Sequence, residues 1–125
     1  MNNTLLVMAG GAVGAALRYH LGRIAPPLLG TALPWGTLIA NIAGGLAMGL
    51  LAGALARFNL GGEHTRLLLA VGVLGGFTTF SAFSLETVLM IERGQLALAL
   101  GYVLLSVLGA LGALAVGLAT MRAVA

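Results

Sequence analysis

Residues 75–84 read GGFTTFSAFS, a polar run inside a long apolar segment that extends from Leu67 to about Ile91. Two adjacent glycines followed by two β-branched threonines weaken an α-helix at this point. The run therefore predicts a break at membrane depth, which is tolerated only where protein or a water-filled cavity surrounds it. The alternative is a packed, kinked helix whose Ser and Thr hydroxyls bond back to their own backbone.

A helix broken at this depth exposes backbone groups of both signs. Unwound carbonyl oxygens can bind a cation, whereas the N-terminus of the restarted helix favours an anion. The density of hydroxyl and aromatic side chains in residues 75–84 favours a functional site over packing alone.

The composition of the whole chain is that of a protein in lipid. Of its 125 residues, 60% are hydrophobic and 7% are charged, whereas a soluble domain carries about 25% charged residues. This composition excludes an ordinary soluble protein, a disordered tail and most small enzymes. Cysteine is absent, which excludes disulfides and thiolate metal sites.

A helix needs about 20 apolar residues to cross about 30 Å of hydrocarbon. The sequence predicts four such helices in a single domain, residues 1–125, at Thr4 to Tyr19, Trp35 to Ala56, Leu67 to about Ile91, and Gln95 to Met121. The first segment is not a signal peptide, because its Arg follows the apolar run instead of preceding it.

Short connections with helix-breaking residues separate the four segments. All three prolines, Pro26, Pro27 and Pro34, lie between the first two segments, and a tight turn is expected at residues 92–94. Many of the 20 glycines recur every four positions, as at Gly10 and Gly14. This spacing lets helix backbones approach closely in lipid.

The six basic residues are all Arg and are spread singly, which argues against nucleic-acid binding. With four spans both termini lie on one side, and the two sides carry almost equal numbers of Arg. A chain without a positive excess has no preferred orientation. The balance predicts that inverted copies pair as an antiparallel, dual-topology homodimer. The two groups are Arg57, Arg66 and Arg122 against Arg23, Arg93 and Arg18.

Polar and aromatic side chains inside the spans are candidates for an ion pathway. Phe80 and Phe83 share a helical face, as do Ser81 and Ser84. The positive edges of a ring pair can approach an anion without a full charge. Core packing is the competing interpretation of the two rings.

A second group of polar side chains lies in the second and fourth spans. Asn41 shares a stripe with Thr37 and is either a link between helices or a donor in a pore. Tyr102 and Ser106, four residues apart, extend a row of donors or serve packing.

The remaining charged and ionisable side chains have several possible roles. Arg18 can reach the headgroups, pair with Glu86, or draw anions into a vestibule, and Glu86 can line that vestibule. His20 and His64 are expected to be solvated and not to bind metal. No catalytic triad, carboxylate pair, phosphate loop or zinc spacing is present, so catalysis is not expected.

The chain resembles the Fluc (CrcB) fluoride channels over essentially its full length. The resemblance rests above all on residues 75–84, and also on residues 10–14 and 17–19, on Gly36-Thr37-Leu38 and on Asn41. Two positions depart from the family pattern: Ala82 stands where Thr is common, and Ala110 where many members have Ser.

The resemblance implies an antiparallel dimer with two fluoride pores in a prokaryotic inner membrane, which exports fluoride passively. It implies a structural sodium ion held by the backbone carbonyls of Gly75 and Thr78 from both subunits. The positions that match the pore lining are Asn41, Phe80, Phe83 and Tyr102, with Ser81 and Ser84 nearby.

Two other classes of protein are compatible with a short, four-span chain. A small multidrug exporter needs a carboxylate in the first helix, where this chain has Arg18 and no acid. A non-conducting or holin-like assembly subunit does not need a broken, polar third helix.

Overall fold

The computed structural model describes residues 2–59 and 61–124, and these residues form an all-helical structure. Four helical stretches are long and apolar enough to cross a membrane: Asn3–Leu29, Trp35–Phe58, Gly62–Glu92 and Leu96–Ala123. The four apolar segments expected from the sequence are therefore confirmed. The elements are α1 (Asn3–Leu29), α2 (Trp35–Phe58), α3 (Gly62–Thr65), the π-helix η1 (Arg66–Leu74), α4 (Gly75–Phe77), α5 (Ser81–Glu92) and α6 (Leu96–Ala123).

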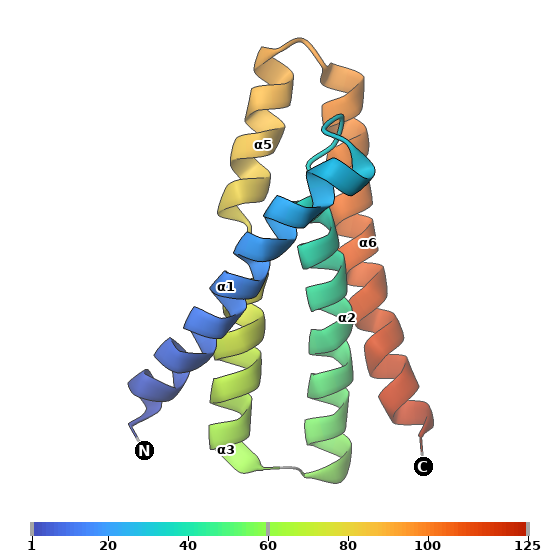
Figure 1. Ribbon diagram of the computed structural model, residues 1–125. Coiled ribbons are helices and arrows are strands. Elements are labelled where there is room, and N and C mark those ends of the chain that lie inside the picture. Colours follow the sequence, from blue (N-terminus) through green and yellow to red (C-terminus); the bar gives the residue numbers. More distant parts are fainter. Residues whose placement is uncertain (1, 60, 125) are drawn as a thin grey trace.

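The long helices are arranged around α2 (Figure 1). α2 and α6 run side by side in the same direction, and the column from α3 to α4 stands on the other side of α2. α1 crosses this column and α2 at a slant, while α5 continues beyond α1 to the opposite end of the molecule. Both chain ends lie at the end where α3 begins.

The first helix is longer than the sequence predicts. α1 continues to Leu29 and contains Pro26 and Pro27, so the prediction that these prolines lie in the connection is wrong. A proline removes one backbone donor and crowds the preceding turn, but such residues are tolerated in apolar helices where neighbours satisfy the freed groups. The last turn closes through the Gly30 amide, which donates to the Pro26 carbonyl at 2.8 Å.

Glycines bring the backbones of neighbouring helices into direct contact, as their spacing predicts. A Cβ on Gly10 would lie 2.9 Å from Gly72 Cα, and one on Gly14 would clash with the Val73 carbonyl. The pair α2–α6 is built in the same way, because a Cβ on Gly45 would lie 2.7 Å from the Ala110 carbonyl oxygen. These contacts position α1 and α6 against the polar segment.

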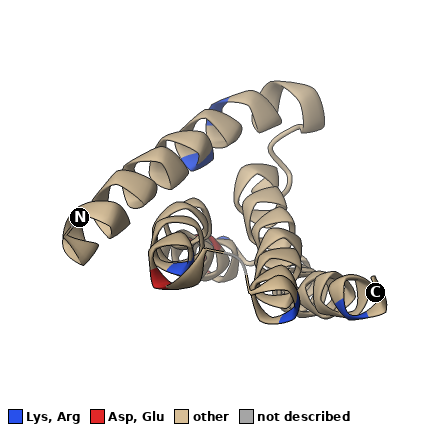
Figure 2. Ribbon diagram, turned by 90° about the horizontal axis from the view of Figure 1, so that it is seen from below, with Lys and Arg blue, Asp and Glu red and all other residues tan. Residues whose placement is uncertain are grey.

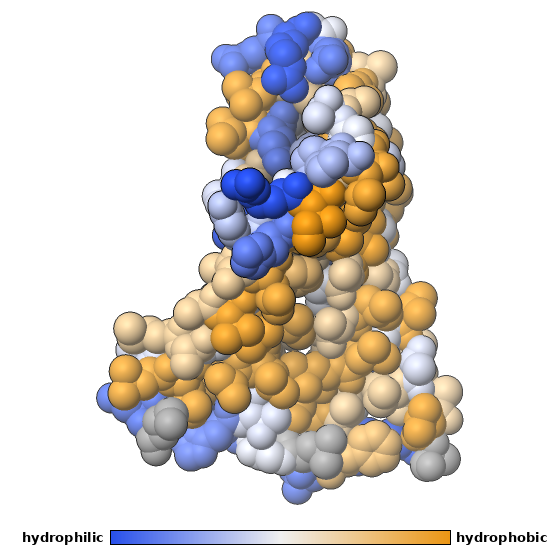
Figure 3. Space-filling model, viewed as in Figure 1, coloured by the Kyte–Doolittle hydropathy of each residue, from blue (hydrophilic) through white to orange (hydrophobic). Residues whose placement is uncertain are grey.

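The surface has the distribution of polarity expected of a membrane-spanning chain. Apolar side chains cover the middle of the face in Figure 3, and hydrophilic ones gather toward both ends and on the upper part of α1. Seen from below, the charged residues at the near end sit where α3 meets η1 and on the last turns of α2 and α6 (Figure 2). There Arg66 forms an ion pair with Glu63 at 3.7 Å.

Replacing Gly14 by Ala is expected to destabilise the protein, because the added methyl group would clash with the Val73 carbonyl and lie 2.7 Å from the Phe77 amide nitrogen. Overpacking of this kind costs about 1–3 kcal/mol. The measurement is the unfolding temperature in detergent. Gly11→Ala is the matched control, since a Cβ on Gly11 has no neighbour within 4 Å. Equal unfolding temperatures for both variants would contradict the packing assigned to Gly14.

Candidate functional site

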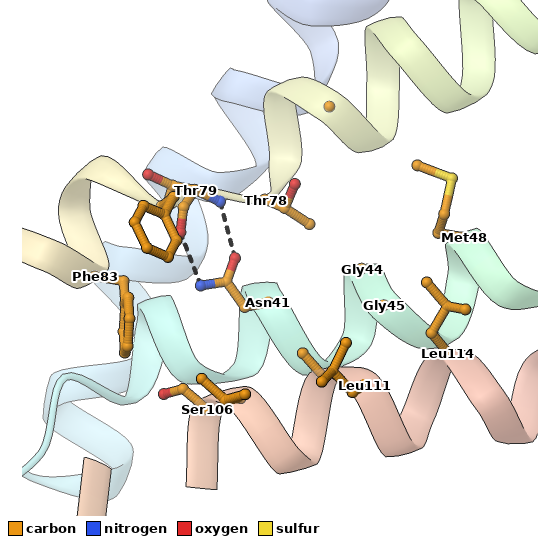
Figure 4. Close-up of a pocket in the computed structure, with 14 residues that line it drawn as sticks. Asn41, Gly44, Gly45, Met48, Thr78, Thr79, Phe83, Ser106, Leu111 and Leu114 are labelled. Carbon is orange, nitrogen blue, oxygen red and sulfur yellow. Dashed lines mark hydrogen bonds between the residues drawn. The ribbon is translucent and has the colours of Figure 1, made fainter. Parts of the chain in front are cut away.

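The chain leaves the helical conformation between α4 and α5. Thr78 is extended, with φ −83° and ψ 160°, and α5 begins at Ser81. The backbone N–H and carbonyl of Thr79 both bond to a side chain instead of to helical backbone groups. Its amide donates to Asn41 Oδ1 at 2.8 Å, and its carbonyl accepts from Asn41 Nδ2 at 2.9 Å (Figure 4). One side chain from α2 therefore satisfies both backbone groups of a non-helical residue.

Two further carbonyls at this interruption have identified donors. The Leu74 carbonyl accepts from the Thr78 amide and from the Thr78 hydroxyl, both at 3.0 Å. The Gly76 carbonyl accepts from Arg18 Nε at 3.4 Å. Within the described residues no hydrogen bond reaches the carbonyls of Gly75, Phe77 or Thr78.

A cavity of about 530 Å³ opens beside the interruption. Its lining is mainly apolar, with a few polar groups from three elements: Asn41 on α2, Thr78 and Thr79 in the interruption, and Ser106 on α6 (Figure 4). Ser106 is buried, and its hydroxyl has no hydrogen-bond partner in the described part of the chain. An apolar cavity with a few convergent polar groups is typical of a binding site for a small ligand.

Three aromatic side chains form a continuous row at this cavity. The ring centroids of Phe80 and Phe83 are 5.5 Å apart, and those of Phe83 and Tyr102 are 5.3 Å apart. Phe83 is 8% exposed, whereas Phe80 is 76% exposed and projects from the chain. The structure thus brings together the three rings that the sequence analysis assigned to one pathway. Phe83 and Tyr102 are buried, whereas Phe80 is exposed.

Glu86 is the meeting point of two other predicted residues. Thr37 Oγ1 donates to Glu86 Oε2 and the Tyr102 hydroxyl donates to Glu86 Oε1, each at 2.9 Å. Thr37 and Glu86 also line a second cavity of about 200 Å³ near the connection from α1 to α2. The possible pairing of Arg18 with Glu86 is not observed among the described residues, since the only bond found for Arg18 is to Gly76.

Ser81 and Ser84 lie apart from the cavity lining. The Ser84 hydroxyl donates back to the Phe80 carbonyl at 2.9 Å, and the Ser81 hydroxyl lies 3.3 Å from that of Thr79. Ser84 and Thr78 therefore both bond back to a carbonyl of the preceding turn, which is the alternative considered for residues 75–84.

Sequence reasoning gave too little weight to Ser106, which it considered only as an extension of Tyr102. The four-residue spacing from Tyr102 was the available signal. Neither its burial nor its lack of a partner could be read from the sequence. His20 is exposed on α1 and His64 lies in α3, and the described residues contain no cluster of three His, Asp or Glu side chains.

Four helices that are long and apolar enough to span a membrane, with a cavity that a few polar groups line, define a small multi-pass membrane protein. A model of the CrcB-like proteins, described as Camphor Resistance (CrcB), matches residues 5–118. The chain therefore belongs to the CrcB family, and the resemblance to that family is confirmed.

Curated relatives match the chain along its whole length. The fluoride-specific ion channel FluC of Novosphingobium aromaticivorans is 53% identical over 127 residues, covering 100% of both chains. The proteins of the same name from Phenylobacterium zucineum and Chelativorans sp. are 56% and 54% identical, covering 98% or more of each chain. These relatives are bacterial ion channels by name and not enzymes, as the missing catalytic set led us to expect.

Tyr102→Phe and Thr37→Val are each expected to destabilise the protein, because each leaves one Glu86 oxygen without its hydroxyl donor. Removing one partner of a buried or partly buried acceptor costs about 1–3 kcal/mol. The unfolding temperature in detergent measures this. Thr120→Val is the control, since its exposed hydroxyl bonds back to the Val116 carbonyl. An equal effect of all three variants would rule out a special role of the Glu86 contacts.

Proposed function

We propose that this protein is a fluoride-specific channel that lets fluoride leave the cytoplasm passively and electrogenically, which lowers fluoride toxicity. The observation that carries the proposal is the full-length match, at 53–56% identity, to relatives named fluoride-specific ion channels. The cavity supports it, because amide, hydroxyl and ring-edge groups are donors suited to a small anion.

The proposed pathway begins at the cavity near Thr37 and Glu86 and passes the aromatic row toward Asn41 and Ser106. Phe80 and Phe83 present ring edges, and Asn41 and Ser106 supply an N–H and an O–H. Thr37 and Glu86 line the entrance, and the buried Tyr102 hydroxyl bonds to Glu86 there. In this proposal Ser81 and Ser84 stand beside the aromatic pair, and Arg18 attracts anions toward the vestibule.

We further propose that two inverted copies of the chain form the working unit in the inner membrane, with one pore along each side. The even distribution of Arg supports dual insertion. Large apolar side chains exposed on α5 and α6, such as Leu85, Leu100 and Leu108, provide surface for lipid and for a second copy. The strongly exposed Phe80 is consistent with a ring that is covered in the assembly.

A structural sodium ion at the interruption is part of the proposal. The Gly75 and Thr78 carbonyls have no hydrogen-bond donor among the described residues, and both residues line the larger cavity. Carbonyl oxygens are suitable ligands for a hard cation, and unwound carbonyls coordinate sodium in other membrane proteins. These residues therefore fit such an ion, which would offset the negative end of the helix formed by η1 and α4.

Fluoride release from liposomes that contain the purified protein tests the proposed function. With potassium inside and valinomycin present, a fluoride electrode should record rapid release, and chloride release should be much slower. Without valinomycin the release should stop, because electrogenic flow needs a compensating charge. Liposomes that stay sealed to fluoride despite a folded protein would contradict the proposal and favour a non-conducting assembly subunit.

Phe83→Ile is expected to slow fluoride release by about tenfold, because it removes a ring edge that the proposal places on the pathway. Aromatic edge contacts contribute about 0.5–1.5 kcal/mol, and 1.4 kcal/mol corresponds to a tenfold change in rate. Phe58→Ile is the control, since Phe58 ends α2 away from the cavity. Unchanged release in Phe83→Ile and Phe80→Ile alike would remove the rings from the pathway.

A further inference from the structure

The position of the non-helical segment depends on very few contacts. Among the described residues, the Thr79 amide and carbonyl have no backbone partner, and both bond to Asn41. Figure 4 shows the Asn41 side chain projecting from α2 toward the Thr79 backbone, with its amide bonded to both the N–H and the carbonyl of that residue. The two bonds are as short as those of regular secondary structure, at 2.9 and 2.8 Å.

We propose that Asn41 is a positioning residue, whose side-chain amide fixes the two peptide planes on either side of the Thr79 Cα and thereby sets the direction of the Thr78 carbonyl and of the Phe80 ring. The Thr79 N–H shares its peptide plane with the Thr78 carbonyl, and the Thr79 carbonyl lies in the plane that leads into Phe80. Rotation of either plane therefore moves one of these two groups. What the carbonyl and the ring then do rests on the proposed function, but the hold on Thr79 does not.

The chemistry of the contact needs an asparagine. One side chain must donate to a carbonyl and accept from an amide at the same time, in one plane. Aspartate lacks the donor when ionised, serine has a single hydroxyl on a shorter side chain, and glutamine is one methylene longer. Asparagine pairs with the N–H and the carbonyl of Thr79 as the residue opposite it would in an antiparallel sheet.

The surroundings of Asn41 make it a fixed reference point. Its neighbour Ala40 is completely buried, and Gly45 on the following turn packs against the α6 backbone. Gly44 lies one turn after Asn41 on the same face of α2, and a Cβ there would clash with the Thr78 methyl group. α2 therefore contacts two successive residues of the interruption: Thr78 packs against Gly44, and Thr79 bonds to the Asn41 amide.

The positioning role leaves one hydrogen of the Asn41 side-chain amide without an acceptor among the described residues. Nδ2 carries two hydrogens, of which one is used by the Thr79 carbonyl. The second hydrogen is available to the cavity that Asn41 lines. Holding the backbone and donating to an ion are thus separate functions of one side chain, and they can be measured separately.

Residue-resolved amide hydrogen exchange tests the hold on Thr79 directly, in the full-length protein and without any fluoride measurement. In the unmodified protein the Thr79 amide should be protected. The Phe80 and Ser81 amides, for which the structure gives no acceptor among the described residues, should exchange faster. Equal exchange at all three positions would overturn the proposal without the need for a variant.

Two variants separate the donor and acceptor halves of the contact. Asn41→Ala should raise the exchange rate of Thr79 by about tenfold or more, since it removes the acceptor of that amide. Asn41→Asp keeps an acceptor oxygen and should keep Thr79 protected. Protection of Thr79 that survives in Asn41→Ala would overturn the proposal, as would its loss in both variants.

The effect of Asn41 on the Thr78 carbonyl is measured as the sodium concentration needed to raise the unfolding temperature. Asn41→Ala should need about tenfold more sodium for the same stabilisation, although Asn41 lies outside the carbonyl set of Gly75 and Thr78. Phe83→Ile, a change on the aromatic row, should not alter this dependence. A slow Asn41→Ala channel with unchanged sodium dependence would reduce Asn41 to a pore donor and contradict the positioning role.

If liposomes show no fluoride release at all, the proposed function fails, while the exchange pattern at Thr79 still decides whether Asn41 holds the interruption.

Discussion

The two hydrogen bonds between Asn41 and the Thr79 backbone satisfy both polar groups of a non-helical residue in an apolar environment. A backbone polar group without a partner costs several kcal/mol in hydrocarbon. Between α4 and α5 the chain gives up its helical bonds, so other groups must replace them. Asn41 on α2 supplies two, and the guanidinium of Arg18 on α1 supplies one, to the Gly76 carbonyl. Two helices are thereby tied to one short stretch.

The need for partners to the backbone groups of the interruption explains why the helices approach so closely. Arg18 reaches the Gly76 carbonyl only because α1 lies directly on the column of η1 and α4. Gly14, one turn before Arg18, leaves no space for a side chain there. On the other side of the interruption, Gly45 and Gly49 bring α6 onto α2, which places Ser106 across the cavity from the segment that Asn41 holds. Close packing is what makes the polar site possible at this depth.

The sequence predicted the features that follow from local composition. Four apolar stretches, small residues every fourth position and the weakness of residues 75–84 all have direct physical causes in the residues themselves. The features that depend on partners could not be predicted in this way. The continuation of α1 through Pro26 and Pro27 and the π-helical turns of η1 depend on how neighbouring helices pack. The meeting of Thr37, Glu86 and Tyr102 joins three helices, and no spacing within one helix reveals it.

The interruption offers backbone groups of opposite sign at its two ends, which bears on how the proposed anion pathway and the proposed sodium site could lie side by side. The end of α4 presents the carbonyls of Gly75 and Thr78, and such carbonyls alone would repel an anion. A cation held there changes the sign of the local field. Glu86 would also repel an anion, but hydroxyl donors from Thr37 and Tyr102 occupy both of its oxygens and reduce that repulsion. The only full positive side-chain charge bonded to the interruption is that of Arg18, among the residues described. In the proposed pathway, neutral donors such as Asn41 and Ser106 would therefore suffice, because the proposed sodium ion and Arg18 would balance the charge at its margins. A charged ligand on the pathway would bind the ion too tightly to release it.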